Sequence, residues 1–475
     1  MFAEPNFAAK WRLIFRPWIA GYLSVAAPLQ VLATPGQTPS HANPQIEAKP
    51  ASKSFSLAEA IELAFAQNPD LAAAVARIGQ AEARVAEMAA GFYPKVTARA
   101  GYDYTDNPAL AFSYIVAQRR FNVSNPTDFN SYVNNPGWVE NFRPEVIGTI
   151  NLYRGGQDSY LTKAAELGVK ASELEHSALR NRLAAAVTSA YYAAISAPKQ
   201  AQVAEQSSTT VLREVELTKA KMHEGVALRG DVLSLEVRSK AAKETELQAR
   251  NNIALSRSTL KSLLGSTDAE LPTPRETEFP DPKLNGNLMK KFDEAMSQRP
   301  ELLAATHQVK ISESELDAAN GALLPRINAM ASYGSNSPNL DPNSYRGNAS
   351  IGINAEYDVF AGGAISARIS KAERRVAEAQ AIEQKTRLEV ENEVRQAYST
   401  LEQAIERVQV AEAGSKSADE ALRLVSEQYH GGTATVTRYL EAETDRANAS
   451  LRFIVARFEA QVAEAQLLQA IGHWR

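Results

Sequence analysis

The feature that most constrains the fold is an internal duplication, because the same landmark residues recur along the chain at constant intervals. In the first part of each copy the interval is 231 residues, as from Pro69 to Pro300. Further along it is 207 residues, as from Gly225 to Gly432. The difference of 24 residues indicates an insertion in the first copy, between Tyr102 and its next landmark. The chain therefore encodes one structural unit twice.

Both copies carry the same predicted order of elements: two helices, a strand, a loop, a strand, a very long helix and a shorter final helix. In the first copy the first two helices are expected at about 56–67 and 70–92, because Pro94 ends the second one. The long helix is expected at about 157–223, directly after a Gly-Gly turn, and is on the order of 100 Å long. A helix at about 231–264 completes the copy.

The long helical segment has the residue spacing of a coiled coil. Leu167, Ala171, Leu174 and Ala178 step by four and three positions. Because alanine fills much of this seam, neighbouring helices can approach closely. Pro198 interrupts the pattern, and we expect a kink there.

The predicted strands alternate between apolar and polar side chains, so each has one dry face and one wet face. The apolar positions are Val96, Ala98, Ala100, Tyr102 and Tyr104, then Val146, Gly148, Ile150 and Leu152, then Ile327, Ala329, Ala331 and Tyr333, then Ala349, Ile351, Ile353, Ala355, Tyr357 and Val359. We expect about nine to eleven residues per strand, the length of a tilted membrane strand.

A dry sheet face must be covered, either by helices or by lipid. In lipid only a closed barrel satisfies all backbone hydrogen bonds, and four strands are too few to close one. Strands from several copies are therefore expected to pool. A soluble α+β protein with two small hairpins is the alternative.

Aromatic residues fall near the predicted strand ends, where a membrane barrel carries its girdles. Those at the end nearer the helices are Phe92, Tyr93, Tyr153 and Phe360, and those at the far end are Tyr102, Tyr104 and Tyr333.

The N-terminus resembles a secretory signal peptide. Basic residues precede an apolar stretch from Ile19 to Ala33, with cleavage expected before Thr34; a retained anchor helix is the alternative. The domain organisation that we predict is a signal peptide at 1–33, a flexible leader at 34–54, a first repeat at 55–270, a linker at 271–286 and a second repeat at 287–475.

Composition excludes several classes of function. The 51 Lys and Arg residues nearly balance the 55 Asp and Glu residues, so no basic footprint for nucleic acid exists. There is no Cys and only six His, which leaves little for a metal centre or a thiol nucleophile. A mean hydropathy of −0.30 excludes a multi-span helical membrane protein. No phosphate-binding loop occurs. We expect no catalytic residues, no metal and no cofactor.

These features together resemble the TolC family of outer-membrane efflux channels. The likeness covers about residues 55–475 and includes the Asn-Pro and Arg-Pro-Glu-Leu helix starts, the Tyr-Pro and Leu-Pro breaks, and the Tyr-Arg-Gly-Gly and Val-Phe-Ala-Gly-Gly turns. The resemblance implies a mainly α fold with a small β part: a long α-helical coiled-coil barrel with four transmembrane strands per chain. It implies a homotrimer whose twelve strands form one barrel in outer-membrane lipid. Expected partners are a periplasmic adaptor (membrane fusion) protein and an inner-membrane pump of RND or ABC type.

The resemblance also assigns roles at the turns between the long and short helices. Gly225, Val226, Gly432 and Thr433 would form adaptor-docking tips at the periplasmic end. Asp231 and Tyr429 match positions that bond between neighbouring helices and hold the tunnel shut. Capping of the following helix is the alternative for Asp231.

Arg438 and Glu441 match two positions on the inner wall of the constriction. Family members carry acidic residues at both, so Arg438 is a departure that weakens the expected preference for cations. Arg438 is expected to pair with Glu441 one turn away, or with Asp231. Ala434 stands where the family has a basic residue that helps to lock the tip. A solvated surface turn is the alternative for all of these.

The function implied is a passive exit duct, opened at its helical tip by adaptor and pump. The cargo, by efflux or by type I secretion, stays open. A secreted coiled-coil structural or adaptor protein without a barrel is the alternative from another class. His223 and His430 stand at equivalent helix ends, where a pH-sensitive tip is a weaker hypothesis than a favourable helix-end charge.

Overall fold

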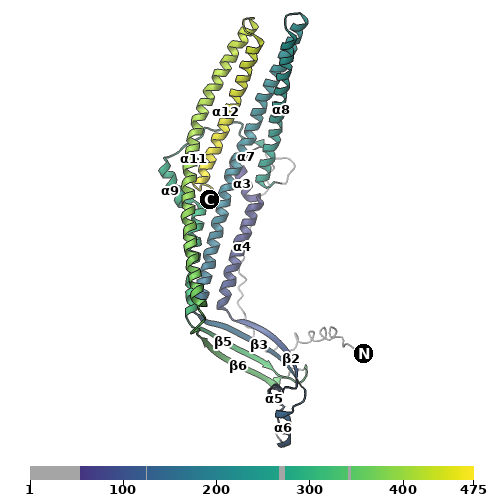
Figure 1. Ribbon diagram of the computed structural model, residues 1–475, viewed down its shortest axis with the longest axis vertical. Coiled ribbons are helices and arrows are strands. Elements are labelled where there is room, and N and C mark those ends of the chain that lie inside the picture. The colour runs from purple at the N-terminus through teal and green to yellow at the C-terminus, as the bar shows by residue number, and fades with distance from the viewer. Residues whose placement is uncertain (1–53, 123, 125, 267–272, 341–343) are drawn as a thin grey trace, which may run out of the picture. The chain divides into compact units, whose positions relative to one another are not determined.

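The computed structural model describes residues 54–475, except 123, 125, 267–272 and 341–343 (Figure 1). The description below concerns the unit 54–475. The predicted signal peptide and leader therefore lie outside the described residues, apart from Ser54. That residue belongs to the short strand β1 (Ser54–Phe55).

The fold is mainly α with a small β part, and the two copies contain matching elements. The first copy contains α3 (Leu57–Gln67), α4 (Pro69–Ala89), β2 (Lys95–Thr105), β3 (Val139–Arg154), α7 (Gln157–His223) and α8 (Arg229–Leu264). The second contains α9 (Leu288–Gln298), α10 (Pro300–Asn320), β5 (Arg326–Ser335), β6 (Gly347–Glu356), α11 (Ala364–His430) and α12 (Val436–Ala470). Among the described residues, no helix combines the length and the hydrophobicity needed to cross a bilayer.

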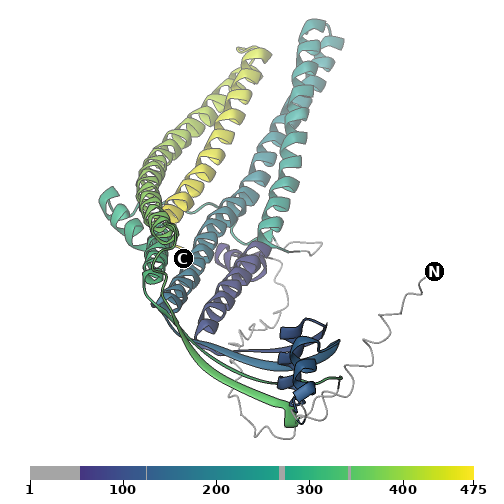
Figure 2. The ribbon, with the colours of Figure 1, turned by 60° about the horizontal axis from the view of Figure 1, so that its bottom comes forward.

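The helices form four adjacent columns. Long helix α7 packs against α4 and α8 on one side and against α10 and α12 on the other, and α11 packs against α10 and α12 (Figure 1 and Figure 2). The column order is therefore α4 with α8, then α7, then α10 with α12, then α11. Alanine dominates the buried positions of α7 and α12, which agrees with the close approach expected from the seam.

The short helices meet end to end at two equivalent joints. In the first copy, Asn68 donates from Nδ2 to the carbonyl oxygen of Leu263 at 3.0 Å, and its Oδ1 caps α4 by accepting from the Asp70 amide. In the second copy Arg299 holds the equivalent position and donates to the carbonyl oxygen of Ala470 at 3.0 Å. A polar side chain at the start of one helix thus binds the free carbonyls at the end of the other.

Each joint also contains a glycine just after the end of α8 or α12. Gly265 and Gly472 have φ values of 68° and 76°, in the left-handed region that ends helices. A Cβ on Gly265 would lie 2.5 Å from the carbonyl oxygen of Gln67, and one on Gly472 would lie 2.9 Å from that of Gln298. Conformation and space therefore both require glycine at these two positions.

The four long strands form one antiparallel sheet in the order β2-β3-β5-β6. The predicted apolar positions face one another across it, as in the row Ala98, Val146, Tyr333 and Ala349. Leu152 is the exception, because the register between β3 and β5 shifts there and Tyr153 lies opposite Ile327. This confirms the expected dry face. Strands β2 and β6 are the sheet edges, and within the described part of the chain neither has a further partner strand.

The opposite face of the sheet is polar. Arg99 of β2 and Glu145 of β3 form an ion pair of 3.5 Å. A row of amides crosses the other strands, with Asn151 opposite Asn328 and Asn328 opposite Asn354. The sheet thus has the two chemically distinct faces that the alternation predicted.

The length of one strand and the end of another were predicted wrongly. Strand β3 has 16 residues instead of nine to eleven, because the polar stretch before Val146 continues to pair with the end of β2. Strand β6 ends at Glu356, so Tyr357 and Val359 lie beyond it. Glu356 pairs with Arg326, and the preceding Pro325 has no amide hydrogen with which to extend the ladder.

The insertion of the first copy is folded. Between β2 and β3, where the sequence predicted a loop, lie α5 (Pro108–Ala117) and α6 (Pro126–Asn134). Ala111 and Ile115 of α5 pack on Val139 of β3 in a small core of their own. The helices lie at the end of the sheet away from the long helices (Figure 1).

The linker between copies is bound to the helices. Thr273 and Pro274 form β4, which pairs with β1. Phe279 is buried, and its carbonyl oxygen accepts a 2.5 Å hydrogen bond from Arg457 of α12. Gln461, one turn further along α12, binds the carbonyl of Pro280 at 2.8 Å. One face of α12 is therefore covered by the linker.

Candidate functional site

The turns from long to short helices are closed by glycine, as expected. Gly225 and Gly432 have φ values of 78° and 77°. Val226 beside the first turn is 76% exposed. In the second turn the Thr433 amide donates to the carbonyl oxygen of Gln428 at 2.9 Å. These turns therefore present exposed surface on a fixed backbone.

Tyr429, near the end of α11, reaches the neighbouring helix pair. Its hydroxyl donates to the carboxylate of Glu214 on α7 and accepts from Lys221 Nζ at 3.1 Å. Tyr439 of α12 stacks on its ring with 5.1 Å between ring centres. Burial and the bond to Glu214 raise the pKa of Tyr429, so its hydroxyl stays protonated and remains a donor. These four residues are called the tyrosine lock below.

An apolar cluster lies beside the tyrosine lock and joins the same helices. Val211 and Val215 of α7, Leu235 of α8 and Leu440 of α12 are buried together. At this end of the chain the pair α7–α8 is thus held to the pair α11–α12 by one apolar cluster and one polar network.

Glu443 of α12 is buried in the same region, with 3% of its surface exposed. Its closest cation is Arg446 at 3.9 Å, and Arg446 lies closer to Asp419 of α11, at 3.1 Å. The Oε1 atom of Glu443 has no hydrogen-bond partner among the described residues. Burial raises the pKa of Glu443; the charge of Arg446 opposes this effect and that of Asp419 adds to it.

Asp231 caps the start of α8, which was the alternative role expected for it. Its Oδ2 accepts from the Leu228 amide at 3.3 Å at the start of α8, and within the described contacts it is not a partner of Tyr429. Arg438 lies 3.7 Å from Glu441, the ion pair expected at this spacing. Both side chains are largely exposed.

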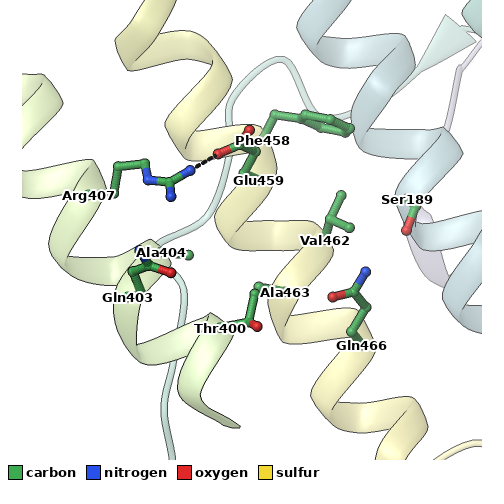
Figure 3. A pocket seen from close by; sticks show the side chains of 10 residues that line it. All are labelled: Ser189, Thr400, Gln403, Ala404, Arg407, Phe458, Glu459, Val462, Ala463 and Gln466. Carbon is green, nitrogen blue, oxygen red and sulfur yellow. Dashed lines mark hydrogen bonds and ion pairs between the residues drawn. The ribbon is translucent and has the colours of Figure 1, made fainter. Parts of the chain in front are cut away.

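The face of α12 opposite the linker lines open hollows. Figure 3 shows one of about 360 Å³, bounded by α7, α11 and α12. Arg407 of α11 and Glu459 of α12 point toward each other in it and form a 2.6 Å ion pair. Arg438 and Glu441 line a second hollow, with α7 and α8. Polar and charged side chains therefore lie along this face of α12, from Arg438 near the turn to Glu459.

The predicted girdle residues are exposed on the single chain. The exposed fractions lie between 43% for Tyr153 and 89% for Phe360. Phe92 and Tyr93 precede β2, Tyr102 and Tyr333 lie within strands, and Phe360 follows β6. In addition, Trp138 stacks on Tyr104 with 4.8 Å between ring centres, at the far end of the sheet.

Sequence reasoning missed Glu214, Lys221 and Glu443 at the turn end of the helices. A comparison of the two copies offers a signal for the first: Glu214 of the first copy corresponds to Ala421 of the second. A buried position that changes from a charged to a small residue between copies marks a contact that only one copy makes. Within the described residues, no group of three or more His, Asp or Glu side chains is placed to bind a metal ion.

Comparisons with known proteins agree with this architecture. The sequence model of a family described as "Outer membrane efflux protein" matches residues 60–266 and 292–473. Outer membrane protein OprJ of Pseudomonas aeruginosa is 28% identical over 323 residues, which is 67% of each chain. Outer membrane efflux protein BepC of Brucella suis is 25% identical over 357 residues, 70% of this chain and 77% of BepC. The solved outer-membrane channel OprN superposes with a TM-score of 0.74 at 21% identity, over 88% of this chain and 89% of OprN, which shows a shared fold.

Proposed function

Because the chain belongs to the outer membrane efflux protein family and is a protein of the outer membrane, we propose that three copies form one exit duct. The duct consists of a twelve-stranded barrel in the outer membrane, continuous with a helical tunnel through the periplasm. The observation that carries this proposal is that, among the described residues, one chain has uncovered edges on both sides: β2 and β6 in the sheet, and the α4–α8 column and α11 among the helices. An open sheet edge is not tolerated in lipid, whereas a ring has none.

The strand count requires more than one copy, and three is the number that the resemblance to the TolC family implies. Each chain supplies four long strands, and membrane barrels begin at about eight. Three copies give twelve strands, with the apolar face toward lipid and the row of asparagines toward the lumen. The far end of the sheet, with α5 and α6, then lies outside the cell, and the helical turns lie in the periplasm.

The duplication supplies a template for the contact between copies. Within the chain, Val215 of α7 and Leu440 of α12 share a buried cluster. The equivalent residues, 207 positions away, are Leu422 of α11 and Leu233 of α8. Leu440 is 4% exposed, whereas Leu233 is 53% exposed on the single chain. We expect α11 of one copy to cover Leu233 of the next.

Charge supports the same pairing. Helix α8 carries seven basic and four acidic residues. The part of α11 that lies level with it, residues 397–430, carries three basic and six acidic residues. Opposite charges on the two open edges favour their association and disfavour wrong pairings.

The inner wall of the tunnel would be the face of α12 that carries Arg438, Glu441 and Glu459. The opposite face is covered by the linker, and a connecting segment inside a closed ring would obstruct passage. Arg438 and Glu441 would then stand at the periplasmic mouth, with basic and acidic groups in equal number.

The tyrosine lock and the apolar cluster beside it would hold the periplasmic end closed. They join the two helix pairs at the end where a transport partner must enter. Docking of a periplasmic adaptor protein and an inner-membrane pump on the exposed turns would separate the pairs and open the duct. The cargo is then a solute for efflux or, with an ABC-type pump, a secreted protein.

Cysteine crosslinking tests the ring directly, since the natural chain has no Cys. The double variant Leu233→Cys with Leu422→Cys should form disulfides between copies and yield covalent trimers on non-reducing gels. Each single variant is the matched control and should not form them. Crosslinks confined to one chain, or absent from a purified oligomer, would contradict the proposed seam.

The variant Tyr429→Phe tests the closed state. Loss of the hydroxyl leaves the buried Glu214 carboxylate without its donor, a loss of about 1–3 kcal/mol from the closed junction. We expect a higher conductance of the purified channel in a lipid bilayer, without adaptor or pump. Tyr160→Phe, far from the turns on α7, should conduct like the natural channel. Unchanged conductance of Tyr429→Phe would show that the tyrosine lock does not hold the channel closed.

The alternative of a secreted coiled-coil protein without a barrel is disfavoured, because members of this family are channel proteins of the outer membrane.

A further inference from the structure

Helix α5 of the insertion packs on the polar face of the sheet, at the end away from the long helices (Figure 1). Val139 and Asn141 of β3 belong to the same face as Glu145, because residues two apart along a strand share a face. Ile115 of α5 is 4% exposed and packs on Val139. Gln118, just after the helix, donates from Nε2 to Oδ1 of Asn141 at 3.1 Å. The helix therefore covers the face that would line the lumen of a barrel.

The insertion extends across the sheet from its first strand to its last. Helix α5 follows β2 in the chain and packs on β3. Arg119, two residues after the helix, donates from Nη2 to the carbonyl oxygen of Gly347, the first residue of β6, at 3.4 Å. The ten residues of α5 span about 15 Å, and the outer two of four strands lie about 14 Å apart. The length of α5 thus matches the width of the sheet.

The end of α5 is fixed to both copies of the unit. Arg119 has a φ of 55° and is the non-glycine residue with a positive φ in the described part of the chain. Glycine usually takes this left-handed conformation after a helix. Here the residue is an arginine, whose guanidinium lies 5.0 Å from the ring centre of Tyr345 in the second copy. Gln118 is 1% exposed and also donates to the carbonyl oxygen of Glu140 in the first copy, at 2.7 Å.

The side of α5 that is turned away from the sheet is exposed and uncharged. The helix has no charged residue between Pro108 and Ala117. Ser113 and Val116, which are three positions apart and so lie on one side of the helix, are both exposed, Val116 by 46%. When the polar face of the sheet lines a lumen, this side of α5 points toward the axis of the barrel.

The dimensions of a twelve-stranded barrel leave little room for three such helices. Twelve tilted strands enclose a cylinder with a radius of about 12 Å from axis to backbone. A helix with its side chains is about 10 Å thick. Three α5 helices laid on the inner wall, one from each copy, therefore leave a passage of only a few ångström around the axis.

We propose that the three α5 helices form a collar inside the outer mouth of the duct, and that this collar limits the cargo to small solutes rather than polypeptide chains. The proposal rests on the ring proposed above and names the class of cargo that the ring carries. Ser113 and Val116 of each copy surround the axis in the collar. The collar lies at the opposite end of the molecule from the tyrosine lock, and it is formed by an insertion that the second copy lacks.

The variant Ser113→Cys tests the collar without any measurement of transport. In the purified trimer the three thiols should lie close together around the axis, so a short bismaleimide should link two of the three copies into covalent dimers. Ala349→Cys, on the apolar face of β6, is the control, because its copies lie on the outside of the barrel and should not be linked. Trimers in which Ser113→Cys stays unlinked overturn the collar and leave the duct standing. Absence of trimers in native mass spectrometry counts against the duct itself, and the collar falls with it.

Ile115 and Val116 provide a matched pair of variants for the size limit, measured as conductance in a lipid bilayer. Ile115→Asp places a charge in the contact with Val139 and should release α5 from the sheet. Larger polyethylene glycols, added on the outer side, should then enter the channel and lower its conductance. Val116→Asp leaves that contact intact and should keep the size limit of the natural channel. Its three carboxylates around the axis should instead shift the reversal potential in a potassium chloride gradient toward selectivity for cations.

Each variant can overturn the proposal separately. An Ile115→Asp trimer with the size limit of the natural channel would show that α5 does not narrow the outer mouth. Unchanged selectivity of Val116→Asp would show that this side of α5 does not face the axis. Where Ile115→Asp does not assemble into trimers, Val116→Asp and the crosslinking of Ser113→Cys decide.

Discussion

The two copies of the unit share their landmark residues but differ in the contacts that a few single residues make. The landmark glycines and prolines are the same in both copies, and the sequence was sufficient to place the turns at Gly225 and Gly432. The partners of Tyr429 could not be predicted, because Glu214 lies 215 positions away and its position depends on the packing of three helices. Likewise, nothing local marks Glu443 as buried: its equivalent, Glu236, is a surface residue.

The glycine at each helix joint provides a prediction at this scale. Gly472→Ala should lower the stability of the helical part by about 1–3 kcal/mol, since it combines a positive φ with a Cβ only 2.9 Å from a carbonyl oxygen. Gly168→Ala in α7 is the control, because a Cβ there meets nothing within 4 Å. It should be neutral or stabilising by up to about 1 kcal/mol. The thermal loss of the helical circular dichroism signal measures both, and equal midpoints would contradict the assignment of the joint.

Arg438 yields a second residue-scale prediction. In the proposed mouth its positive charge balances that of Glu441, 3.7 Å away. Arg438→Glu should make the mouth strongly acidic and shift the reversal potential in a potassium chloride gradient toward selectivity for cations. Lys371→Glu, exposed near the other end of α11, adds the same charge away from the mouth. A shift of equal size in both variants would mean that Arg438 does not line the constriction.

At the scale of elements, the long helices were the easiest to predict and the strands the hardest. A Gly-Gly turn begins each long helix and a glycine turn follows each end, so 157–223 was placed correctly. The length of β3 was missed because its first half carries polar residues on both faces, and only pairing with β2 defines it. The helices α5 and α6 were missed because the insertion has no counterpart in the second copy to compare with.

The two joints between short helices should differ in strength. Arg299 is 5% exposed and binds the end of α12, Glu301 at 2.9 Å and Glu393 of α11 at 2.5 Å, whereas Asn68 makes fewer contacts. Arg299→Ala should therefore lower the free energy of unfolding by about 1–3 kcal/mol, and Asn68→Ala should lower it by less. Both changes are measured as shifts of the thermal midpoint. Since Arg299 bridges three helices, its variant should also expose α12 to proteolysis. A larger effect of Asn68→Ala would reverse this ranking.

For the whole molecule, the sequence predicted a mainly helical chain with a two-faced sheet, and the structure confirms both. The association of strands from several copies is argued from edges, since among the described residues β2, β6, α8 and α11 each have one side that no other element covers. The gate and the inner wall both presuppose that these edges meet in a ring.

Native mass spectrometry of the detergent-extracted protein tests that premise most directly. The ring account predicts particles of three chains that persist at low concentration, because every open edge is covered by the neighbouring copy. Single chains as the stable species, or a protein that stays dispersed in water after the detergent is removed, would contradict it.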